Sequence, residues 1–529
     1  MRTRRRWSEA RGWLALVLVV TAVAAPAVAL AHIERPTTFP DSTRGSVPTI
    51  RTGGNSLVVC KPDSRVRIER LKGLIRERNR ELLRTCVYRH IQQAVDAATN
   101  GARILVLPGV YREEPSRQAP ADDPRCAELK VEVPDVAGLT VPGYAYHRRC
   151  PNAHNLIAIV GDSNEDGVCD DKCNLQIEGT GATPADVVID GDARKLNVIR
   201  GDRADGLVLL KFTVQKSDFN NVYLIETNGF RFERVVSRWS KEYGFLTFTT
   251  DHGLYNRAIA YGNGDSGFYP GSAPEGGCSR YGIEIRNSEA YGNMAGYSAT
   301  AGNSVWVHDS SFHDNVVGLV TDSAFPGHPG MPQDCAKWER NTIYSNNLNP
   351  YTPKRNAYCR RPYVQRDPRV LCPQLPLPVG TGLIILGGNS NLVRTNWIYD
   401  NWRAGASLYW VPAFARGEPD PAKATDTSHG NRFLDNRMGI RPDGTRAPNG
   451  VDFLWDEEGT RNCWQGNRPA LGKRITSDPK SLPRCPGRAE FQPANSQKFG
   501  ELASCINWNP FTNPYPKGCS WYRTPKRPR

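Results

Sequence analysis

The sequence is poor in soft-metal ligands and in long apolar runs. Only 4 Met and 9 His occur among its 529 residues, mostly dispersed, so a soft-metal function such as copper-site maturation has little support. After residue 31, no segment is apolar over the roughly 20 residues that a membrane-spanning helix needs. The mean hydropathy of -0.52 and the 39% hydrophobic content argue against a wide, compact core.

Several functional motifs are also missing. The sequence contains no nucleophile elbow, Walker loop or metal-binding helix motif, and no nucleic-acid-binding module. The formal net charge is +14. Because the basic residues are scattered, this charge is compatible with a plain solvated surface or with an acidic polysaccharide partner. We expect no nucleic-acid partner.

Residues 1–31 have the layout of a secretory signal peptide. A basic start precedes the apolar stretch Trp13–Leu30, and Ala29-Leu30-Ala31 is a typical cleavage site. An uncleaved membrane anchor is the alternative. We expect a soluble, secreted mature chain without a membrane span, and a monomer.

Cysteine usage agrees with export. All 14 Cys follow the predicted signal peptide, and an even number in an oxidising compartment indicates disulfides. Close spacing suggests four of the pairs, although sequence does not determine connectivity: Cys60–Cys86, Cys126–Cys150, Cys169–Cys173 and Cys359–Cys372.

An internal repeat is the most informative feature. The repeat begins with an apolar or small residue, usually followed by an aromatic. Gly, Ser or Asp comes next, then Asn, and a Gly often follows three or four residues later. Copies occur at 260–263, 290–293, 312–315, 343–346, 398–401, 433–436 and 464–467. Short runs of alternating polarity flank each copy, which predicts two or three strands per repeat, separated by Gly and Asn turns.

The repeat length favours a solenoid. Gly244 and Gly267 are 23 residues apart and Gly296 and Gly318 are 22 apart, whereas propeller blades take about 40 residues. One such coil cannot bury its apolar face alone, so stacked coils are expected to share a narrow core. The repeated Asn would then form a ladder of side-chain amides. We predict an all-β parallel β-helix over residues 88–470.

The two ends differ from the repeats. Residues 90–98 form a predicted amphipathic helix that caps the open end of the solenoid. Residues 32–87 are an N-terminal extension whose segment 63–86 resembles a charged helical insert. Residues 471–529 look like an irregular, disulfide-rich C-terminal cap with a basic tail.

Two segments resemble a known superfamily. Residues 91–98 with 104–111, and 177–181 with 187–191, are similar to early coils of pectin-lyase-like right-handed β-helix proteins. The resemblance implies a right-handed parallel β-helix. It does not imply one reaction, because that fold hosts lyases, hydrolases, epimerases, adhesins and accessory proteins.

Residues 162–170 predict a structural calcium site. Oxygen side chains at alternating positions followed by Gly167 suit a hard cation and resemble EF-hand and thrombospondin type 3 loops, although Cys173 replaces the closing Glu of an EF-hand. An acidic turn without metal is the alternative. The predicted ligands are Asp162, Asn164, Asp166 and Asp170.

A second resemblance concerns catalysis. Tyr243-Gly244-Phe245 matches a mannuronan epimerase motif, but residues 246–248 replace its Asp-Pro-His by Leu-Thr-Phe. Asp251 and His252 lie just downstream and could supply the missing carboxylate and imidazole. A polar turn is the alternative for this pair.

The positions of the insertions predict a groove. Residues 270–280, 323–337 and 412–428 follow the strand after the repeat Gly, and 347–379 enter the same strand from its other side. If the residue after each Gly points inward, three side chains point into this groove: Tyr269 and Tyr409 as sugar-binding rings and Asp322 as an acid. Lys337 and Arg340 are candidates for binding a substrate carboxylate.

We therefore expect a secreted β-helix protein that binds an extracellular polysaccharide, in particular an acidic one. Lyase, epimerase or hydrolase activity on uronates is what the resemblance implies, and the sequence leaves open whether the chain is catalytic. The alternative is a non-catalytic adhesin or wall-associated accessory protein.

Overall fold

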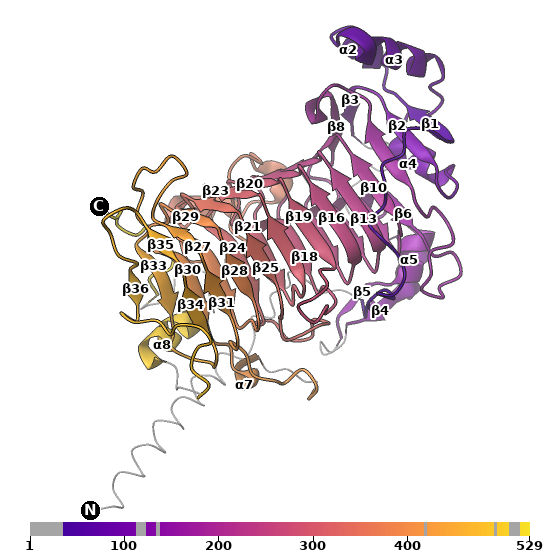
Figure 1. Ribbon diagram of the computed structural model, residues 1–529. Coiled ribbons are helices and arrows are strands. Elements are labelled where there is room, and N and C mark those ends of the chain that lie inside the picture. The colour runs from indigo at the N-terminus through magenta and orange to yellow at the C-terminus, as the bar shows by residue number, and fades with distance from the viewer. Residues whose placement is uncertain (1–34, 113–122, 134–137, 417–420, 491–494, 507–518) are drawn as a thin grey trace, which may run out of the picture.

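The computed structural model describes residues 35–112, 123–133, 138–416, 421–490, 495–506 and 519–529 (Figure 1). The predicted signal peptide, residues 1–31, lies outside the described residues. The chain winds through three long parallel sheets, and each coil adds one strand to each sheet before the next coil begins. Parallel connections of this kind are right-handed. The predicted right-handed parallel β-helix is confirmed.

The three sheets are named here in the order in which each coil visits them. Sheet 1 has 12 strands: β1 (Ser56–Val59), β2 (Arg103–Val106), β7 (Gln176–Gly179), β10 (Leu207–Leu210), β13 (Asn228–Glu233), β16 (Asp251–Asn256), β19 (Ile283–Arg286), β22 (Val305–His308), β25 (Lys337–Glu339), β28 (Leu392–Arg394), β31 (Arg432–Leu434) and β34 (Cys463–Gln465). Sheet 2 has 11 strands: β3 (Gly109–Tyr111), β8 (Val187–Asp190), β11 (Thr213–Gln215), β14 (Val236–Arg238), β17 (Ile259–Tyr261), β20 (Glu289–Tyr291), β23 (Ser311–His313), β26 (Thr342–Tyr344), β29 (Trp397–Tyr399), β32 (Arg437–Met438) and β35 (Arg468–Pro469).

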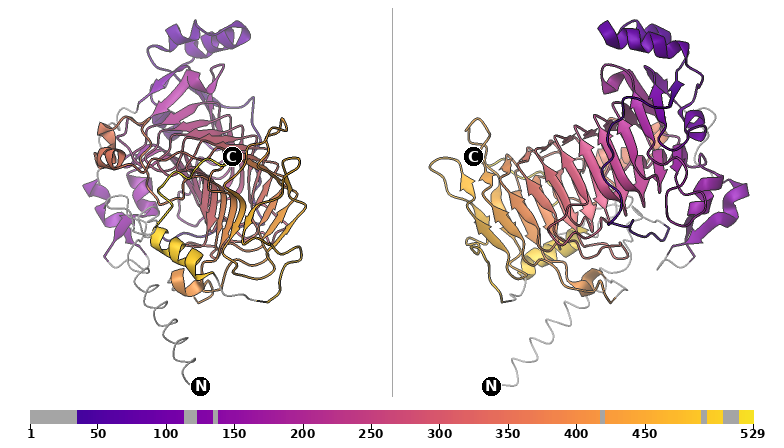
Figure 2. Two further views of the ribbon diagram at one scale, coloured as in Figure 1. Left: turned by 90° about the vertical axis from the view of Figure 1, so that its left-hand side faces the viewer. Right: turned by 45° about the vertical axis from the view of Figure 1, so that its right-hand side comes forward.

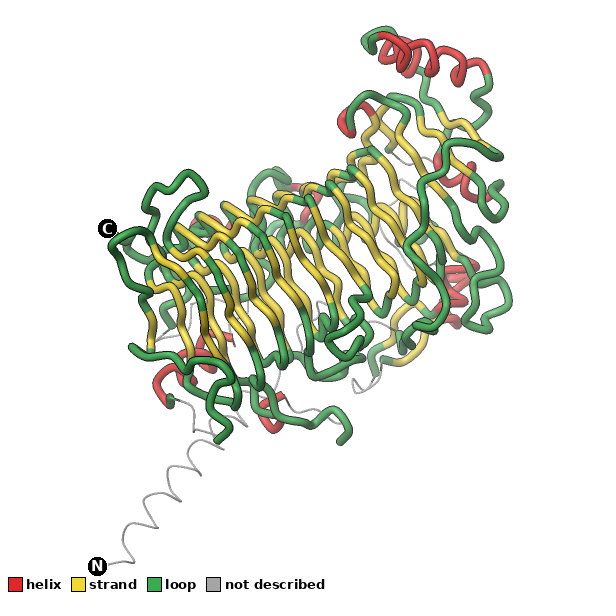
Figure 3. The backbone as a smooth tube through the Cα atoms, in the orientation of Figure 1, coloured by secondary structure: helices red, strands yellow, loops and turns green. Residues whose placement is uncertain are grey.

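Sheet 3 also has 11 strands: β6 (Asn155–Val160), β9 (Asn197–Asp202), β12 (Asn220–Ile225), β15 (Phe245–Phe248), β18 (Ser266–Gly271), β21 (Ala295–Thr300), β24 (Val317–Asp322), β27 (Thr381–Leu386), β30 (Ala404–Tyr409), β33 (Val451–Trp455) and β36 (Ser477–Asp478). The solenoid therefore begins with β1 and ends with β36, so it extends beyond the predicted range 88–470 at both ends. Figure 3 shows the strands stacked as successive rungs.

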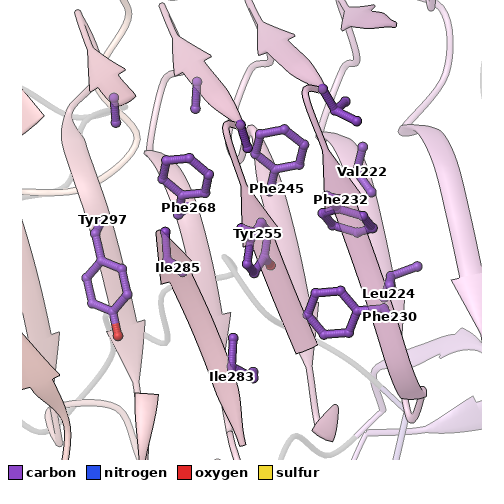
Figure 4. Close-up of a cluster of buried hydrophobic side chains, with 14 of the residues drawn as sticks. Val222, Leu224, Phe230, Phe232, Phe245, Tyr255, Phe268, Ile283, Ile285 and Tyr297 are labelled. Atoms are coloured by element: carbon purple, nitrogen blue, oxygen red, sulfur yellow. The ribbon is translucent and has the colours of Figure 1, made fainter. Parts of the chain in front are cut away.

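The core is a narrow column between the three sheets. Alternate residues of each strand point into it, and Phe245 stacks on Phe268 of the next coil with ring centroids 5.4 Å apart (Figure 4). Tyr255 meets Phe268 edge-on at 5.5 Å. Burying one such ring contributes about 1.5–3 kcal/mol. The stacked coils thus provide the burial that one repeat could not reach alone.

Asparagine ladders stabilise the corners between the sheets. At the corner between sheets 2 and 3, each side-chain amide donates to the amide oxygen of the next coil at 2.8–3.2 Å, through Asn263, Asn293, Asn315, Asn346, Asn401 and Asn449. The predicted ladder is confirmed. A second ladder lies between sheets 1 and 2, formed by Asn341, Asn396, Asn436 and Asn467. A third lies between sheets 3 and 1, formed by Asn391, Asn431 and Asn462.

The repeat copies do not all occupy the same corner. The copies at 433–436 and 464–467 place their Asn between sheets 1 and 2, whereas the earlier copies place it between sheets 2 and 3. The same short pattern fits both corners because each needs a tight turn after a strand and an amide that satisfies main-chain groups of the turn.

The N-terminal end carries the predicted cap and insert. Helix α4 (Ile91–Asp96) buries its apolar face against the first coils. Helices α2 (Ser64–Ile68) and α3 (Gly73–Arg84) project beyond the solenoid, and the Cys60–Cys86 disulfide closes their base (Figure 2).

Smaller elements decorate the N-terminal coils. They are the antiparallel pair β4 (Lys130–Glu132) and β5 (Thr140–Pro142), helix α5 (Tyr144–Arg149), and the 3-10 turns η2 (Pro124–Leu129) and η3 (Pro184–Asp186).

Sheet 3 is covered on its outer face rather than lining an open groove. The insertion between β26 and β27 carries helix α6 (Pro353–Cys359) and turn η4 (Tyr363–Gln365). Side chains from this insertion, from helix α8 (Ser496–Ile506) and from Trp521 and Tyr522 pack on the outer side chains of β24, β27 and β30. Helix α7 (Ala413–Arg416) belongs to an insertion at the opposite edge.

All 14 cysteines form disulfides, including the four pairs predicted from spacing. The other three bonds are Cys278–Cys335, Cys463–Cys485 and Cys505–Cys519. Seven disulfides fit a protein of an oxidising, extracellular compartment. None of the described helices has the length and apolar character that crossing a bilayer requires.

Candidate acid–base site on the outer face of sheet 3

The predicted residues Tyr269, Asp322 and Tyr409 lie on three strands of sheet 3. Phe268 points into the core. Because successive side chains of a strand point to opposite faces of the sheet, Tyr269 points to the outer face. The same alternation applies to Asp322 at the end of β24 and Tyr409 at the end of β30. These side chains are only 3%, 5% and 9% exposed, so neither tyrosine offers an open ring face to solvent.

Asp322 is held by the neighbouring coil. The hydroxyl of Thr300 on β21 lies 3.0 Å from both carboxylate oxygens, and the backbone N–H of Ala324 donates to one of them at 3.0 Å. Burial of the carboxyl raises the pKa of Asp322 to about 6. The group can therefore exchange a proton near neutral pH.

A second buried carboxyl, Asp265, lies just before β18. The Tyr243 hydroxyl and Ser266 hydrogen-bond to it, and its Oδ1 has no hydrogen-bond partner among the described residues. Burial raises the pKa of Asp265 to about 7, and burial also raises the pKa of the adjacent Glu242. Buried carboxyls with raised pKa values are characteristic of functional sites, although structural clusters also show them.

Tyr269 lies between these two carboxyls. Burial raises its pKa, and the charges of Asp322 and Asp265 raise it further. Its ring is 4.6 Å from that of Tyr243, and the N–H of Thr300 approaches its hydroxyl oxygen at 3.4 Å. We call Tyr243, Asp265, Tyr269 and Asp322 the acid–base cluster.

The cluster contains Tyr243, the first residue of the Tyr243-Gly244-Phe245 segment that matches the epimerase motif. Tyr243 occupies the matching position, and the carboxyl that meets its hydroxyl comes from Asp265 in the next coil. Leu246, Thr247 and Phe248 cannot supply it, because their side chains carry no carboxyl.

Sequence reasoning missed Asp265 and Glu242. A signal existed: Asp265 precedes its strand at a position that the next two coils fill with the apolar residues Met294 and Val316. An acid at a repeat position that is otherwise apolar indicates a role other than packing.

Asp251 and His252 do not join the cluster. Both start strand β16 of sheet 1, and Asp251 is fully buried beneath Arg280, whose Nη1 donates to it at 2.8 Å. The Nδ1 atom of His252 lies 2.8 Å from Oδ1 of Asn228. Strand β16 belongs to the coil β16–β17–β18, two coils before the coil that carries Asp322, and it lies in a different sheet. The structure therefore does not assemble the predicted trio.

Lys337 and Arg340 also lie elsewhere, on and after β25 of sheet 1. Lys337 pairs with Glu339 at 2.9 Å. Arg340 pairs with Glu339 and with Asp309, each at 2.8 Å. Both cations are neutralised within sheet 1, and sheet 1 faces away from the acid–base cluster.

A cavity of about 260 Å³ lies beside Tyr409. It opens between the end of sheet 3 and helix α8, and its lining includes Leu454, Lys498, Glu501 and Trp521. Lys498 is engaged by Asp478 at 3.0 Å and by the carbonyl of Trp455 at 2.7 Å. Tyr409 thus belongs to this cavity rather than to the acid–base cluster.

The predicted calcium loop satisfies its own oxygen atoms. The carboxylate of Asp162 accepts hydrogen bonds from Nη1 of Arg203 at 2.6 Å and from the N–H groups of Glu165 and Gly167 at 2.6 and 2.8 Å. Asp170 accepts from the N–H and hydroxyl of Ser163, each at 2.6 Å.

These contacts leave no preformed cation cage. Among the described residues, one group of three possible metal ligands converges, Cys278, Asp334 and Cys335, and its two cysteines form a disulfide. Calcium binding would therefore require Asp162 to release Arg203.

An aromatic ladder follows the outer face of sheet 2. Neighbouring rings stack at 4.8–5.5 Å with interplanar angles of 7–12°, through Tyr261, Tyr291, His313, Tyr344 and Tyr399. Because each ring face is covered by the ring of the next coil, this ladder presents edges and hydroxyls rather than stacking platforms. It stabilises the stack of coils and is a poor sugar-stacking surface.

Comparisons with known proteins give likenesses of fold alone. No family model matches, and no curated protein matches. Among solved structures, the A-module of a mannuronan C-5 epimerase from Azotobacter vinelandii is 14% identical and covers 72% of this chain and 83% of its own, with a TM-score of 0.42.

Two further structures resemble the chain at similar levels. The pectate lyase Pel9A is 10% identical over 82% of each chain, with a TM-score of 0.33. The surface adhesin PfbA of Streptococcus pneumoniae is 11% identical over 74% of this chain and 90% of its own, with a TM-score of 0.36. The parallel β-helix of this chain is shown by its own strand pairing.

Proposed function

We propose that this chain is an extracellular β-helix protein that binds an acidic polysaccharide and carries out acid–base chemistry on it at the acid–base cluster. One observation carries the proposal: Asp322 and Asp265, with pKa values of about 6 and 7, lie on either side of Tyr269 on the outer face of sheet 3. Two carboxyls poised near neutral pH can act as base and acid in one reaction.

The chemistry proposed is proton transfer at C5 of a uronate residue. Between pH 6 and 7, Asp322 is ionised and can accept the C5 proton, while Asp265 is protonated and can donate. The Tyr243 hydroxyl, hydrogen-bonded to Asp265, fixes the orientation of that carboxyl. Return of a proton to C5 gives an epimer, whereas loss of the C4 substituent gives an unsaturated product.

The test is incubation of the protein with uronic-acid polymers in deuterium oxide. Deuterium at C5 measured by mass spectrometry, ultraviolet-absorbing unsaturated ends and new reducing ends report epimerase, lyase and hydrolase activity respectively. We expect Asp265→Asn and Asp322→Asn to abolish the signal.

A matched control keeps this test specific. Asp205, at the turn between β9 and β10, is also a largely buried carboxyl with a pKa raised to about 6. Asp205→Asn makes the same chemical change outside the cluster and should leave turnover intact. Equal losses in all three variants would contradict the assignment.

A non-catalytic accessory or adhesive function is the second candidate. The burial of the acid–base cluster favours it, because a polymer cannot easily reach side chains that are only 2–5% exposed. Binding of the polymer without deuterium exchange or new chain ends would favour this candidate.

A structural calcium ion in the loop at residues 162–170 remains a prediction. A calcium titration followed by thermal unfolding tests it: bound calcium raises Tm, and Asp166→Asn removes the increase. No change of Tm with calcium would show that Asp162 stays paired with Arg203 and that the loop does not bind calcium.

A further inference from the structure

Two arginines face each other without an acidic partner on sheet 2. Arg437 on β32 and Arg468 on β35 are register partners on adjacent strands. Like charges placed directly opposite destabilise a sheet. Neither side chain forms an ion pair with a described residue, and Arg468 is exposed. The guanidinium of Arg437 lies 5.9 Å from the ring centre of Trp397, which supports it from the preceding coil.

Two more arginines lie across the adjoining corner, on the outer face of sheet 1. Arg394 on β28 and Arg432 on β31 come from neighbouring coils, and both are exposed. Neither is ion-paired within the described part of the chain. They contrast with Lys337 and Arg340 of the coil before, which Glu339 and Asp309 neutralise.

The surrounding sequence does not compensate this charge. Residues 430–475 contain eight Lys and Arg and six Asp and Glu. Three of the six acids, Asp452, Asp456 and Glu458, are buried. The C-terminal coils therefore present a net positive surface to solvent.

We propose that Arg394, Arg432, Arg437 and Arg468, here called the arginine surface, bind a chain of uronic-acid residues. The choice of ligand rests on the proposed function. On sheet 2, neighbouring coils place Arg437 and Arg468 directly opposite each other, about 4.8 Å apart, whereas on sheet 1 Arg394 lies two residues further along its strand than Arg432. A polymer with a carboxylate on every sugar matches a row of planar guanidinium groups, each of which binds a carboxylate through two hydrogen bonds.

The arginine surface is separate from the acid–base cluster. The arginines lie on sheets 1 and 2 of the last coils, whereas Asp265 and Asp322 lie on sheet 3 of earlier coils. It therefore acts as a holding site that keeps the polymer on the protein, and its loss lowers affinity without removing acid–base groups.

The experiment measures binding of the full mature chain to immobilised polygalacturonate, with neutral dextran as the reference. Arg437→Gln with Arg468→Gln should weaken binding at least tenfold and reduce its salt dependence. The matched control is Arg65→Gln with Arg70→Gln, which removes the same charge from two exposed, unpaired arginines of the helical insert. The control should change affinity less than twofold.

The outcomes are distinct. Equal weakening by both double variants would overturn the proposal, because net charge alone would then explain binding, and so would unchanged binding of the R437Q/R468Q protein. Stronger binding of double-stranded DNA than of polygalacturonate would assign the surface to another ligand and overturn it as well. An Asp265→Asn protein that binds normally but does not turn over separates this surface from the proposed reaction.

Discussion

The hydroxyl of Thr300 lies 3.0 Å from both carboxylate oxygens of Asp322. The two residues are register partners on β21 and β24, so the contact is set by the stacking of coils. Burial raises the pKa of Asp322 to about 6, because the hydrogen bonds from Thr300 and from the N–H of Ala324 offset the cost of burying the charge only in part.

The first prediction concerns the pH dependence of turnover. The base, Asp322, must be ionised and the acid, Asp265, must be protonated, so kcat/KM on a uronate polymer should rise through about pH 6 and fall through about pH 7. Asp205→Asn should keep this bell-shaped profile. A rate that is flat from pH 5 to 8 would rule out this pair as acid and base.

The second prediction concerns stability. Because the folded-state pKa of Asp265 is raised to about 7 from 3.8, its contribution to stability is lost as pH rises from about 4 to 7. Asp265→Asn removes this loss. The variant should gain stability over the natural protein across that window, by up to a few kcal/mol at about 1.4 kcal/mol per pKa unit, and the difference should level off above pH 7. Urea unfolding at pH 4, 6 and 8 measures it.

The third prediction concerns the asparagine ladder. Nδ2 of Asn346 donates to Oδ1 of Asn401 at 3.0 Å, and its Oδ1 accepts from Nδ2 of Asn315 at 3.0 Å. Asn346→Ala leaves buried polar groups without partners and should cost about 1–3 kcal/mol. Asn55→Ala, at an exposed position just before β1, is the control and should cost less than about 0.5 kcal/mol. Similar losses for both would mean that the ladder adds little.

The fourth prediction concerns the N-terminal segment. Arg35 is buried and pairs with Asp202 at 2.8 Å and with Glu226 at 2.6 Å. Burial alone would raise the pKa of Asp202, but Arg35 and Arg200 hold it at about 2. Arg35→Met should therefore destabilise the fold by about 3–5 kcal/mol at pH 7.

The pH dependence of this loss gives a sharper test. The ion pair of Asp202 contributes stability above its ordinary pKa, and this contribution disappears as pH falls toward 2. The effect of Arg35→Met should shrink between pH 4 and pH 2. Arg44→Met, at an exposed pair with Asp41, should have little effect at either pH.

The fifth prediction compares two disulfides. Cys278–Cys335 spans 57 residues and joins the insertions after β18 and β24, whereas Cys169–Cys173 spans 4. Chain-entropy arguments give about 4 kcal/mol for the long loop and about 2 kcal/mol for the short one. Serine pairs at each site, compared by guanidinium unfolding, should show the larger loss for the long loop. The reverse order would indicate that local strain or residual structure dominates.

Some features follow directly from the sequence. The repeat length of 22–23 residues, the turn chemistry and the even number of cysteines were sufficient to predict a parallel β-helix with four correct disulfides. These features are local. In every coil, alternating polarity predicts a strand and an Asn after the strand predicts a turn. The outward orientation of Tyr269 follows from the same alternation.

Other features depend on contacts between coils. The sequence cannot tell that Asp265 meets the Tyr243 hydroxyl, that Arg280 covers Asp251, or that acids neutralise Lys337 while Arg437 faces Arg468. Asp265 and Tyr243 are 22 positions apart and Arg280 and Asp251 are 29 apart, and Arg437 faces Arg468 only through the register of adjacent strands. Strand register and the path of the insertions decide which side chains meet, and only the tertiary structure determines both.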